Sequence, residues 1–363
     1  MGSLVITDPA FLCGLGALAL GLWVGFWLLV RRHHRVPGVF VAVIAVLLSV
    51  STAADVVNAH YGYLPRFADV VGKASWPTAN VSELTPAPGT TASAHPRGAV
   101  VSLPLPDATS GFGRHSALVY LPPQYFSDPE RRFPVVYLLH GSPGIPVDWF
   151  RSDRAADVGL AAAKADRPVI LVAPRMSRRW SDDSECVDSP QERVETYFTA
   201  DVVPGVDHAL RTVPTRAART LAGNSAGGYC ALNLGLRHRQ QFGTIIDMSG
   251  YTRPTYNKGM QGLFGPRPDL AQVVEANTPS SYAPSLSPEP SVRIWFDVGR
   301  ADRVPRGEIS AIVPVLLDRG QLVWLHLRPG GHVHQVWRPA LRQSVLWAVG
   351  APAEASARGV GPP

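Results

Sequence analysis

The sequence predicts an α/β domain built on a doubly wound, mostly parallel sheet and preceded by two transmembrane helices. From Gly98 onward, short apolar runs typical of buried strands alternate with helical stretches, and this alternation is typical of a parallel sheet. Before Gly98, two apolar runs carry no charged residue. We therefore expect a membrane hairpin at 1–55, a juxtamembrane segment and linker at 56–97, an α/β domain at 98–350 and a disordered tail at 351–363.

The hairpin rests on two apolar runs, at about 11–30 and 38–54, separated by the basic stretch 31–35. The first run is long enough to cross about 30 Å of hydrocarbon as a helix. A signal peptide is disfavoured because no positive residues precede the run. The positive-inside rule places the basic stretch in the cytoplasm. We therefore expect a cell-membrane protein whose large domain is extracytoplasmic.

The segment 73–97 is rich in Pro, Ala, Thr and Ser and has no periodic apolar face, which is typical of a linker. Beyond it, the α/β domain is expected to contain strands and helices in alternation. The expected strands are 117–121, 134–139, 168–174, the strand beginning at Thr220, 244–250, 292–296 and 322–327. The expected helices are 154–165, 194–213, 227–237, 270–276, 305–318 and 334–349.

Composition limits the classes of partner and cofactor that we expect for this chain. The formal net charge is +6, but no basic run is interleaved with aromatic residues, so we expect no nucleic-acid partner. The three cysteines form no C-x-x-C, and no H-E-x-x-H is present, so we expect no metal and no cofactor. A Cys186–Cys230 disulfide is one option in an exported domain, and the sequence leaves it open. It also leaves the oligomeric state open.

The central motif is the stretch from Thr220 to Gly228, TLAGNSAGG. It has the order strand, G-x-S-x-G turn, small-residue helix that a nucleophile elbow requires. Small residues on both sides of Ser225 allow the strand and the helix to approach closely. The helix N-terminus would face a developing oxyanion. The motif predicts Ser225 as a nucleophile, although a bare G-x-S-x-G match is also compatible with a structural turn.

A serine nucleophile needs a base, and the base needs an acid, in the chain order Ser, Asp, His. The strand ending at Phe296 is followed by two aspartates, Asp297 and Asp302. Asp302 is favoured because it follows the turn at Gly299, where the loop can fold back. Asp297 remains the alternative acid and is equally suited to bonding loop amides.

Two histidines follow the last strand, His332 and His334. His332 is favoured as the base because Gly330 and Gly331 precede it and permit a close approach. His334 is expected at the start of the last helix. Ser225, Asp302 and His332 then lie at the carboxyl ends of three strands in the required order. This combination is much more specific for a serine hydrolase than the G-x-S-x-G motif by itself.

An oxyanion hole needs two backbone amides. One is expected from Ala226, directly after the nucleophile, and the other from Ser142 in the loop after the strand ending at Leu139. His140 in that loop is expected to be structural.

Two other features border this region in sequence. Asp182, Asp183, Ser184, Glu185 and Glu192 form an acidic stretch that could line the substrate cleft, although a solvated loop is favoured. Trp149 and Trp180 could line a pocket or serve packing equally well.

Four stretches together resemble the "putative esterase" family of α/β-hydrolases. They are 140–144 (HGSPG), 223–228 (GNSAGG), 299–302 (GRAD) and 330–332 (GGH), with Trp337. The family includes feruloyl esterases, S-formylglutathione hydrolase and the antigen 85 mycolyltransferases, and the resemblance covers about 117–349. It implies Ser225 as nucleophile, Asp302 as acid and His332 as base, with oxyanion amides at Ser142 and Ala226. The hairpin departs from the antigen 85 proteins, which are secreted with cleaved signals.

The predicted function is a membrane-anchored, extracytoplasmic serine esterase that hydrolyses a small-molecule or lipid carboxylic ester through an acyl-enzyme. One alternative is an acyltransferase acting on envelope glycolipids, in which an acceptor sugar outcompetes water. The other is a non-catalytic envelope scaffold that keeps the fold for binding.

Overall fold

The computed structural model describes residues 5–64, 66–70, 76–84 and 95–350. The chain separates into a hairpin unit and an α/β unit that begins at Trp76. The predicted tail at 351–363 and part of the predicted linker lie outside the described residues.

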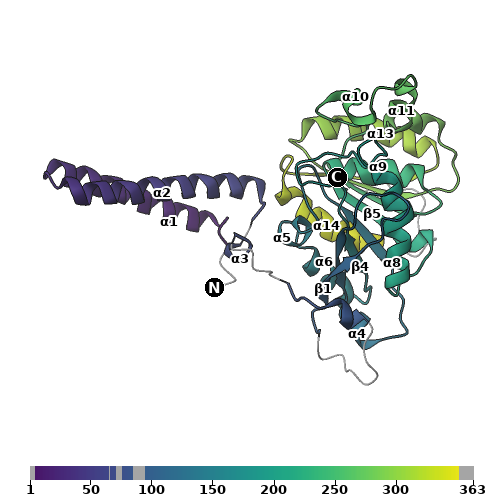
Figure 1. Ribbon diagram of the computed structural model, residues 1–363, viewed down its shortest axis with the longest axis horizontal. Helices are drawn as coiled ribbons and strands as arrows, with labels where there is room; N and C mark the ends of the chain where they lie inside the picture. Colours follow the sequence, from purple (N-terminus) through teal and green to yellow (C-terminus); the bar gives the residue numbers. More distant parts are fainter. Residues whose placement is uncertain (1–4, 65, 71–75, 85–94, 351–363) are drawn as a thin grey trace. The chain divides into compact units, whose positions relative to one another are not determined.

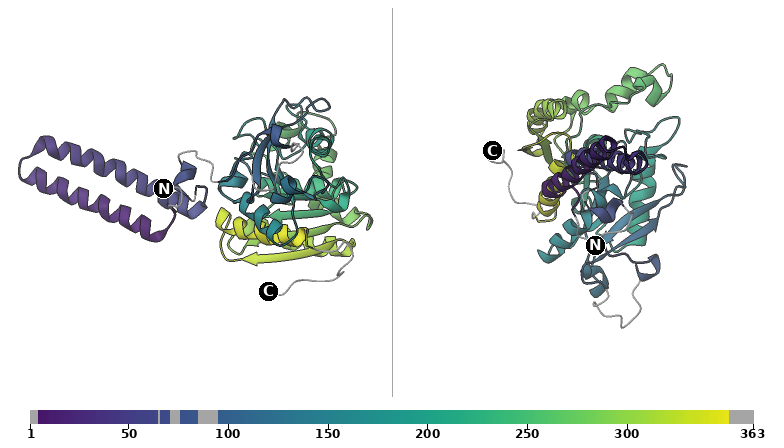
Figure 2. Two further views of the ribbon diagram at one scale, coloured as in Figure 1. Left: turned by 90° about the horizontal axis from the view of Figure 1, so that it is seen from below. Right: turned by 90° about the vertical axis from the view of Figure 1, so that its left-hand side faces the viewer.

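The hairpin unit contains the long helices α1 (Pro9–Arg31) and α2 (Arg35–Tyr61), which lie side by side (Figure 2). The indole Nε1 of Trp23 on α1 donates to Ser49 Oγ on α2 at 3.2 Å. Both helices are long and apolar enough to cross a membrane, and many of their large apolar side chains are exposed, such as Phe40 at 69 %. The short helix α3 (Phe67–Val70) follows in this unit, and the 3-10 turn η1 (Val81–Leu84) belongs to the α/β unit.

The strands of the α/β unit form one sheet within the described residues (Figure 1). They are β1 (Ala99–Pro104), β2 (Ser116–Leu121), β3 (Val135–Leu139), β4 (Ile170–Ala173), β5 (Arg219–Asn224), β6 (Thr244–Met248), β7 (Arg293–Gly299) and β8 (Leu322–Arg328). Their order is β1-β2-β4-β3-β5-β6-β7-β8. The strand β2 runs antiparallel to its neighbours β1 and β4. The predicted mostly parallel α/β sheet is confirmed, because β4 to β8 pair in parallel.

Helices and helical turns connect these strands. They are α4 (Pro123–Ser127), α5 (Asp148–Arg151), α6 (Ala155–Lys164), α7 (Val194–Thr196), the π-helical turn η3 (Tyr197–Val202), α8 (Val203–Ala209), η4 (Arg216–Ala218), α9 (Ala226–Arg237), α10 (Gly259–Phe264), α11 (Leu270–Ala276), α12 (Pro279–Tyr282), η5 (Ala283–Ser285), α13 (Arg303–Asp318) and α14 (His334–Ala348). The central strands β3, β5 and β6 are buried along almost their whole length, as expected for strands covered on both faces.

Two expectations about the elements need correction. The strand β1 was not predicted, and the continuous helix predicted over 194–213 is broken into α7, η3 and α8 and ends at Ala209. In the segment 194–213 the backbone forms a π-helical turn at Tyr197–Val202, just before Val203 and Pro204. Proline has no N–H to donate to the preceding turn of an α-helix, so the α-helical hydrogen bonding is interrupted there.

Candidate functional site

Ser225 lies in a sharp turn between β5 and α9. Its φ is 55° and its ψ is −124°, a conformation that costs energy for a residue with a Cβ. The turn requires small neighbours: a Cβ on Gly223 would lie 1.8 Å from the carbonyl oxygen of Gly227, and one on Gly227 would lie 1.9 Å from that of Leu139. The predicted elbow geometry is therefore present, with α9 packed directly onto the ends of β3 and β5.

The structure brings Ser225, His332 and Asp302 into hydrogen-bonding contact. The Nε2 atom of His332 lies 2.7 Å from Ser225 Oγ, and its Nδ1 atom lies 2.7 Å from Asp302 Oδ2. If the serine hydroxyl donates to Nε2, then Nδ1 carries the ring proton and donates a hydrogen bond to Asp302. Asp302 is 7 % exposed, whereas the His332 side chain is 33 % exposed, so the imidazole is more open to solvent than the carboxylate.

Asp297, the alternative acid, is paired elsewhere. Its two carboxylate oxygens accept from Arg328 Nε at 2.7 and 2.8 Å, and Oδ2 also lies 3.4 Å from Trp295 Nε1. It is fully buried. Burial raises the pKa of Asp297, and the bonds from Arg328 oppose that rise. The other alternative, His334, begins α14, where the sequence placed it.

The loops that carry the acid and the base are tied together. The amide of Arg300 donates to the Arg328 carbonyl at 2.7 Å, and that of Ala301 donates to the Gly330 carbonyl at 2.8 Å. Two rings then flank the imidazole of His332. Trp337 meets it at right angles with centroids 4.9 Å apart, and Tyr251 lies at 6.3 Å. Sequence reasoning missed Tyr251, whose only signal was its place after a strand end.

The His140–Gly144 loop lies against the elbow, as an oxyanion loop should. A Cβ on Gly141 would lie 3.4 Å from Ser225 Cβ and 3.3 Å from the Asn224 carbonyl oxygen. The ring of His140 donates from Nδ1 to the Gly141 carbonyl at 2.9 Å and accepts from the Met176 amide at 3.1 Å. Burial lowers the pKa of His140 to about 4, so the ring is neutral at pH 7 and holds the loop. The oxyanion roles of the Ser142 and Ala226 amides stay predictions.

The acidic stretch is only partly a solvated loop. Asp182 and Asp183 line a polar cavity of about 330 Å³ together with Glu192, Tyr256 and Lys258, among others. Glu185, by contrast, is 1 % exposed and accepts from the amide and hydroxyl of Thr255. Burial and the neighbouring Asp183 charge raise the pKa of Glu185 to about 8.

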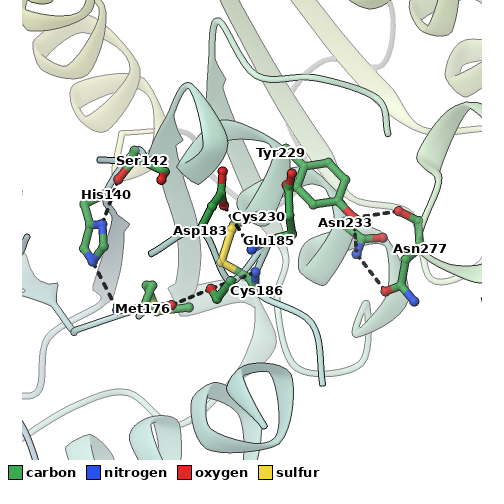
Figure 3. Close-up of a disulfide and its surroundings, with 12 residues drawn as sticks. His140, Ser142, Met176, Asp183, Glu185, Cys186, Tyr229, Cys230, Asn233 and Asn277 are labelled. Atoms are coloured by element: carbon green, nitrogen blue, oxygen red, sulfur yellow. Dashed lines mark hydrogen bonds between the residues drawn. A yellow bond between two sulfur atoms is a disulfide. The ribbon is translucent and has the colours of Figure 1, made fainter. Parts of the chain in front are cut away.

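Cys186 and Cys230 form a disulfide (Figure 3), so the option that the sequence left open is realised. Cys13 is free and exposed. Of the two tryptophans, Trp149 is buried in the core at 1 % exposure and Trp180 is 63 % exposed. Within the described residues, no group of three or more His, Cys, Asp or Glu side chains is arranged to hold a metal ion.

Asp247, near the end of β6, places a carboxyl group beneath the first turn of α9. Its Oδ1 atom accepts from the Gly250 amide at 2.6 Å, and a Cβ on Gly228 would lie 2.4 Å from the same oxygen. The side chain is fully buried. Burial raises the pKa of Asp247 from 3.8 to about 7, although the Gly250 bond opposes the rise.

This raised pKa predicts a pH-dependent stability. The unfolded carboxyl ionises near pH 4, whereas the folded one stays neutral until about pH 7. The contribution of Asp247 to the free energy of unfolding is therefore fully present below about pH 4 and is lost as pH rises through about 7, by at most about 4 kcal/mol. An Asp247→Asn variant keeps a neutral acceptor, so its melting temperature should exceed that of the wild type at pH 8 and match it at pH 4. Equal melting temperatures at pH 8 would contradict the assignment.

Comparisons with known proteins relate the chain to esterases. Residues 113–348 match the family described as "Putative esterase". An uncharacterized protein of Corynebacterium glutamicum is 30 % identical over 323 residues, which cover 85 % of this chain and 75 % of that protein. An esterase of Mycobacterium tuberculosis is 26 % identical over 254 residues, which cover 62 % of this chain and 54 % of that protein.

Solved structures share the fold. A ferulic acid esterase has a TM-score of 0.59 at 23 % identity and covers 69 % of this chain and 97 % of its own. An S-formylglutathione hydrolase from Staphylococcus aureus has a TM-score of 0.56 at 17 % identity and covers 69 % of this chain and 99 % of its own. The predicted resemblance is confirmed: the chain belongs to the "Putative esterase" family and is a hydrolase with an α/β-hydrolase-like fold.

Proposed function

We propose that the chain is a membrane-anchored, extracytoplasmic serine esterase that hydrolyses a small-molecule or lipid carboxylic ester. The observation that carries the proposal is the continuous contact from Ser225 Oγ through the His332 imidazole to Asp302. A serine hydroxyl is a weak nucleophile by itself, and a hydrogen-bonded, oriented imidazole is what activates it.

In this mechanism Ser225 Oγ attacks the ester carbonyl carbon while His332 Nε2 takes the hydroxyl proton. Asp302 holds the ring and stabilises the imidazolium that forms. The carbonyl oxygen becomes an oxyanion that accepts from the amides of Ser142 and Ala226. When the intermediate collapses, the C–O bond to the alcohol breaks and His332 returns the proton to the leaving alkoxide. An acyl group then remains on Ser225.

Water completes the cycle. His332 takes a proton from a water molecule, whose oxygen attacks the acyl carbonyl, and then returns the proton to Ser225 Oγ as the carboxylic acid departs. The Tyr251 and Trp337 rings restrict the imidazole, so the same ring orientation serves both half-reactions.

A fluorophosphonate probe tests the proposed nucleophile. The purified wild type should be labelled at one residue, identified by peptide mass spectrometry as Ser225, because the probe phosphonylates activated serines. Labelling should vanish in Ser225→Ala and fall by at least about 10³-fold in rate in His332→Ala. Ser249→Ala is a matched control, since Ser249 also has a positive φ of 58° but is fully buried. A folded wild type that is not labelled would refute the esterase mechanism.

The proposed anchoring rests on the exposed apolar surface of α1 and α2 and on the basic residues where the two helices meet, Arg31, Arg32 and Arg35. The disulfide supports the outward placement of the α/β unit, because such bonds persist in oxidising compartments. In intact cells, a membrane-impermeant protease should degrade the α/β unit. Full protection of the unit until the membrane is opened would place it in the cytoplasm.

A further inference from the structure

The Cys186–Cys230 disulfide joins two segments that contact the proposed reaction centre. Cys230 lies on α9, the helix that begins directly after Ser225. Cys186 lies between β4 and α7, in the stretch that follows Met176. Both cysteines are 2 % exposed, and Figure 3 shows the bond at the centre of a group of polar contacts.

From Cys186, a chain of hydrogen bonds leads to the oxyanion loop. The Cys186 amide donates to Ser184 Oγ at 3.1 Å, and Ser184 Oγ donates to the Met176 carbonyl. The Met176 amide donates to His140 Nε2, and His140 Nδ1 donates to the Gly141 carbonyl. Since Gly141 lies against Ser225 at the start of α9, the disulfide closes this chain of contacts into a ring.

Two further bonds join the same loops. The Gly144 amide donates to the Trp180 carbonyl at 3.0 Å, and Ser142 Oγ donates to the Asp182 carbonyl at 3.5 Å. The predicted oxyanion residue Ser142 is therefore bonded to the segment that the disulfide fixes. The position of its amide relative to α9 depends on where that segment lies.

The segment is held in an unfavourable backbone conformation. Glu185 and Cys186 are consecutive residues with φ values of 48° and 52°, in the left-handed region that residues with a Cβ rarely occupy. Such conformations persist where surrounding contacts impose them. The contacts here are the disulfide, the Ser184 bonds and the two bonds from Thr255 to the Glu185 carboxyl.

We propose that Ser184, Cys186 and Cys230 form a positioning brace that holds the His140–Gly144 loop in place on the nucleophile helix. The brace keeps the amides of Ser142 and Ala226 directed at one point, where the oxyanion develops. This inference rests on the proposed function, because the brace serves the same reaction. Misplacement of a reacting group by about 1 Å can slow an enzyme by about 10²-fold, so the brace controls kcat rather than substrate binding.

The test compares full-length variants in detergent with p-nitrophenyl acetate as the substrate. The paired variant Cys186→Ala/Cys230→Ala and the single variant Ser184→Ala should each lower kcat by about 10- to 100-fold, with KM within about threefold of the wild type. Cys13→Ser is the matched control, since Cys13 is the free, exposed cysteine of α1. Its kcat should equal that of the wild type.

Non-additivity separates positioning from simple stabilisation. Adding Ser184→Ala to the cysteine pair should lower kcat by no more than about threefold further, because both changes break one ring. All assays are run well below each variant's melting temperature. If the cysteine pair lowers only the melting temperature and leaves kcat unchanged, or if the losses multiply, the brace is wrong.

Two further outcomes separate a failure of the brace from a failure of folding or of the proposed function. Should the cysteine pair fail to fold, Ser184→Ala keeps the disulfide and decides the question alone by its kcat. Should the wild type neither hydrolyse the ester nor react with the fluorophosphonate probe, the proposed function fails and the brace fails with it. An active wild type with unaffected brace variants overturns the brace alone.

Discussion

Asp302→Asn is expected to lower kcat/KM for ester hydrolysis by about 10³- to 10⁴-fold while leaving the fold intact. Asp302 Oδ2 lies 2.7 Å from His332 Nδ1 and accepts a hydrogen bond from the Nδ1–H, which leaves Nε2 free to accept from Ser225. An asparagine amide can instead donate to Nδ1, and this favours the tautomer whose Nε2 already carries a proton. Such a ring cannot accept the proton of Ser225. Steady-state kinetics with p-nitrophenyl acetate measure the loss.

The matched control is Asp297→Asn, which makes the same change of side chain five residues earlier, within β7. Asp297 is fully buried and its carboxylate accepts from Arg328. The substitution leaves the half-buried guanidinium of Arg328 with a weaker partner, so the melting temperature should fall. The folded fraction should keep kcat within about threefold of the wild type. The reverse pattern, a dead Asp297→Asn and an active Asp302→Asn, would make Asp297 the acid.

Gly227→Ala is expected to destabilise the protein by at least about 3 kcal/mol, or to abolish soluble expression. The new methyl group would lie 1.9 Å from the carbonyl oxygen of Leu139, which is backbone in the central strand β3. Neither α9 nor β3 can move without displacing Ser225 from the loop that carries Gly141. Any folded fraction should therefore also lose esterase activity. Thermal unfolding followed by circular dichroism measures the effect.

A second helix glycine provides the comparison. A Cβ on Gly307, in α13, would meet nothing within 4 Å. There the substitution by alanine should follow the ordinary helix preference and stabilise the protein by up to about 1 kcal/mol. If both substitutions have the same effect on the melting temperature, the close approach at Gly227 does not constrain the elbow.

Periodicity and local motifs predicted the parts of the fold that depend on neighbouring residues. The continuous apolar run at 134–139 and the elbow with its following helix are of this kind, and so is the short helix over 270–276, which α11 matches. The strand β1 was not predicted. Its residues follow a Pro- and Ser-rich stretch, and its partner β2 determines its pairing.

For the candidate site, the order of Ser225, Asp302 and His332 after three strands could be predicted, because parallel strands end at one edge of a sheet. The choice between Asp302 and Asp297 depends on Arg328, which lies on a different strand and takes Asp297 as its partner. Such partnerships arise only when distant segments pack.

The closed chain of contacts through Met176, His140 and the disulfide could not be predicted from the sequence for the same reason. Each of its links joins residues from separate segments, and none has a spacing signature. Local preference and strand order therefore predict where the chemistry lies. The contacts that hold it in place appear only in the folded chain.

The strand order has a consequence for the durability of the site. Within the described residues, Ser225 follows β5, which has paired neighbours on both sides, whereas His332 follows β8, the last strand of the sheet. Edge strands open to solvent more readily than central ones. Native-state hydrogen exchange should therefore be faster for amides of β8 than for those of β5. A local opening at this edge would remove the proposed base while the turn at Ser225 stays folded, so the proposed activity would be lost and regained without global unfolding.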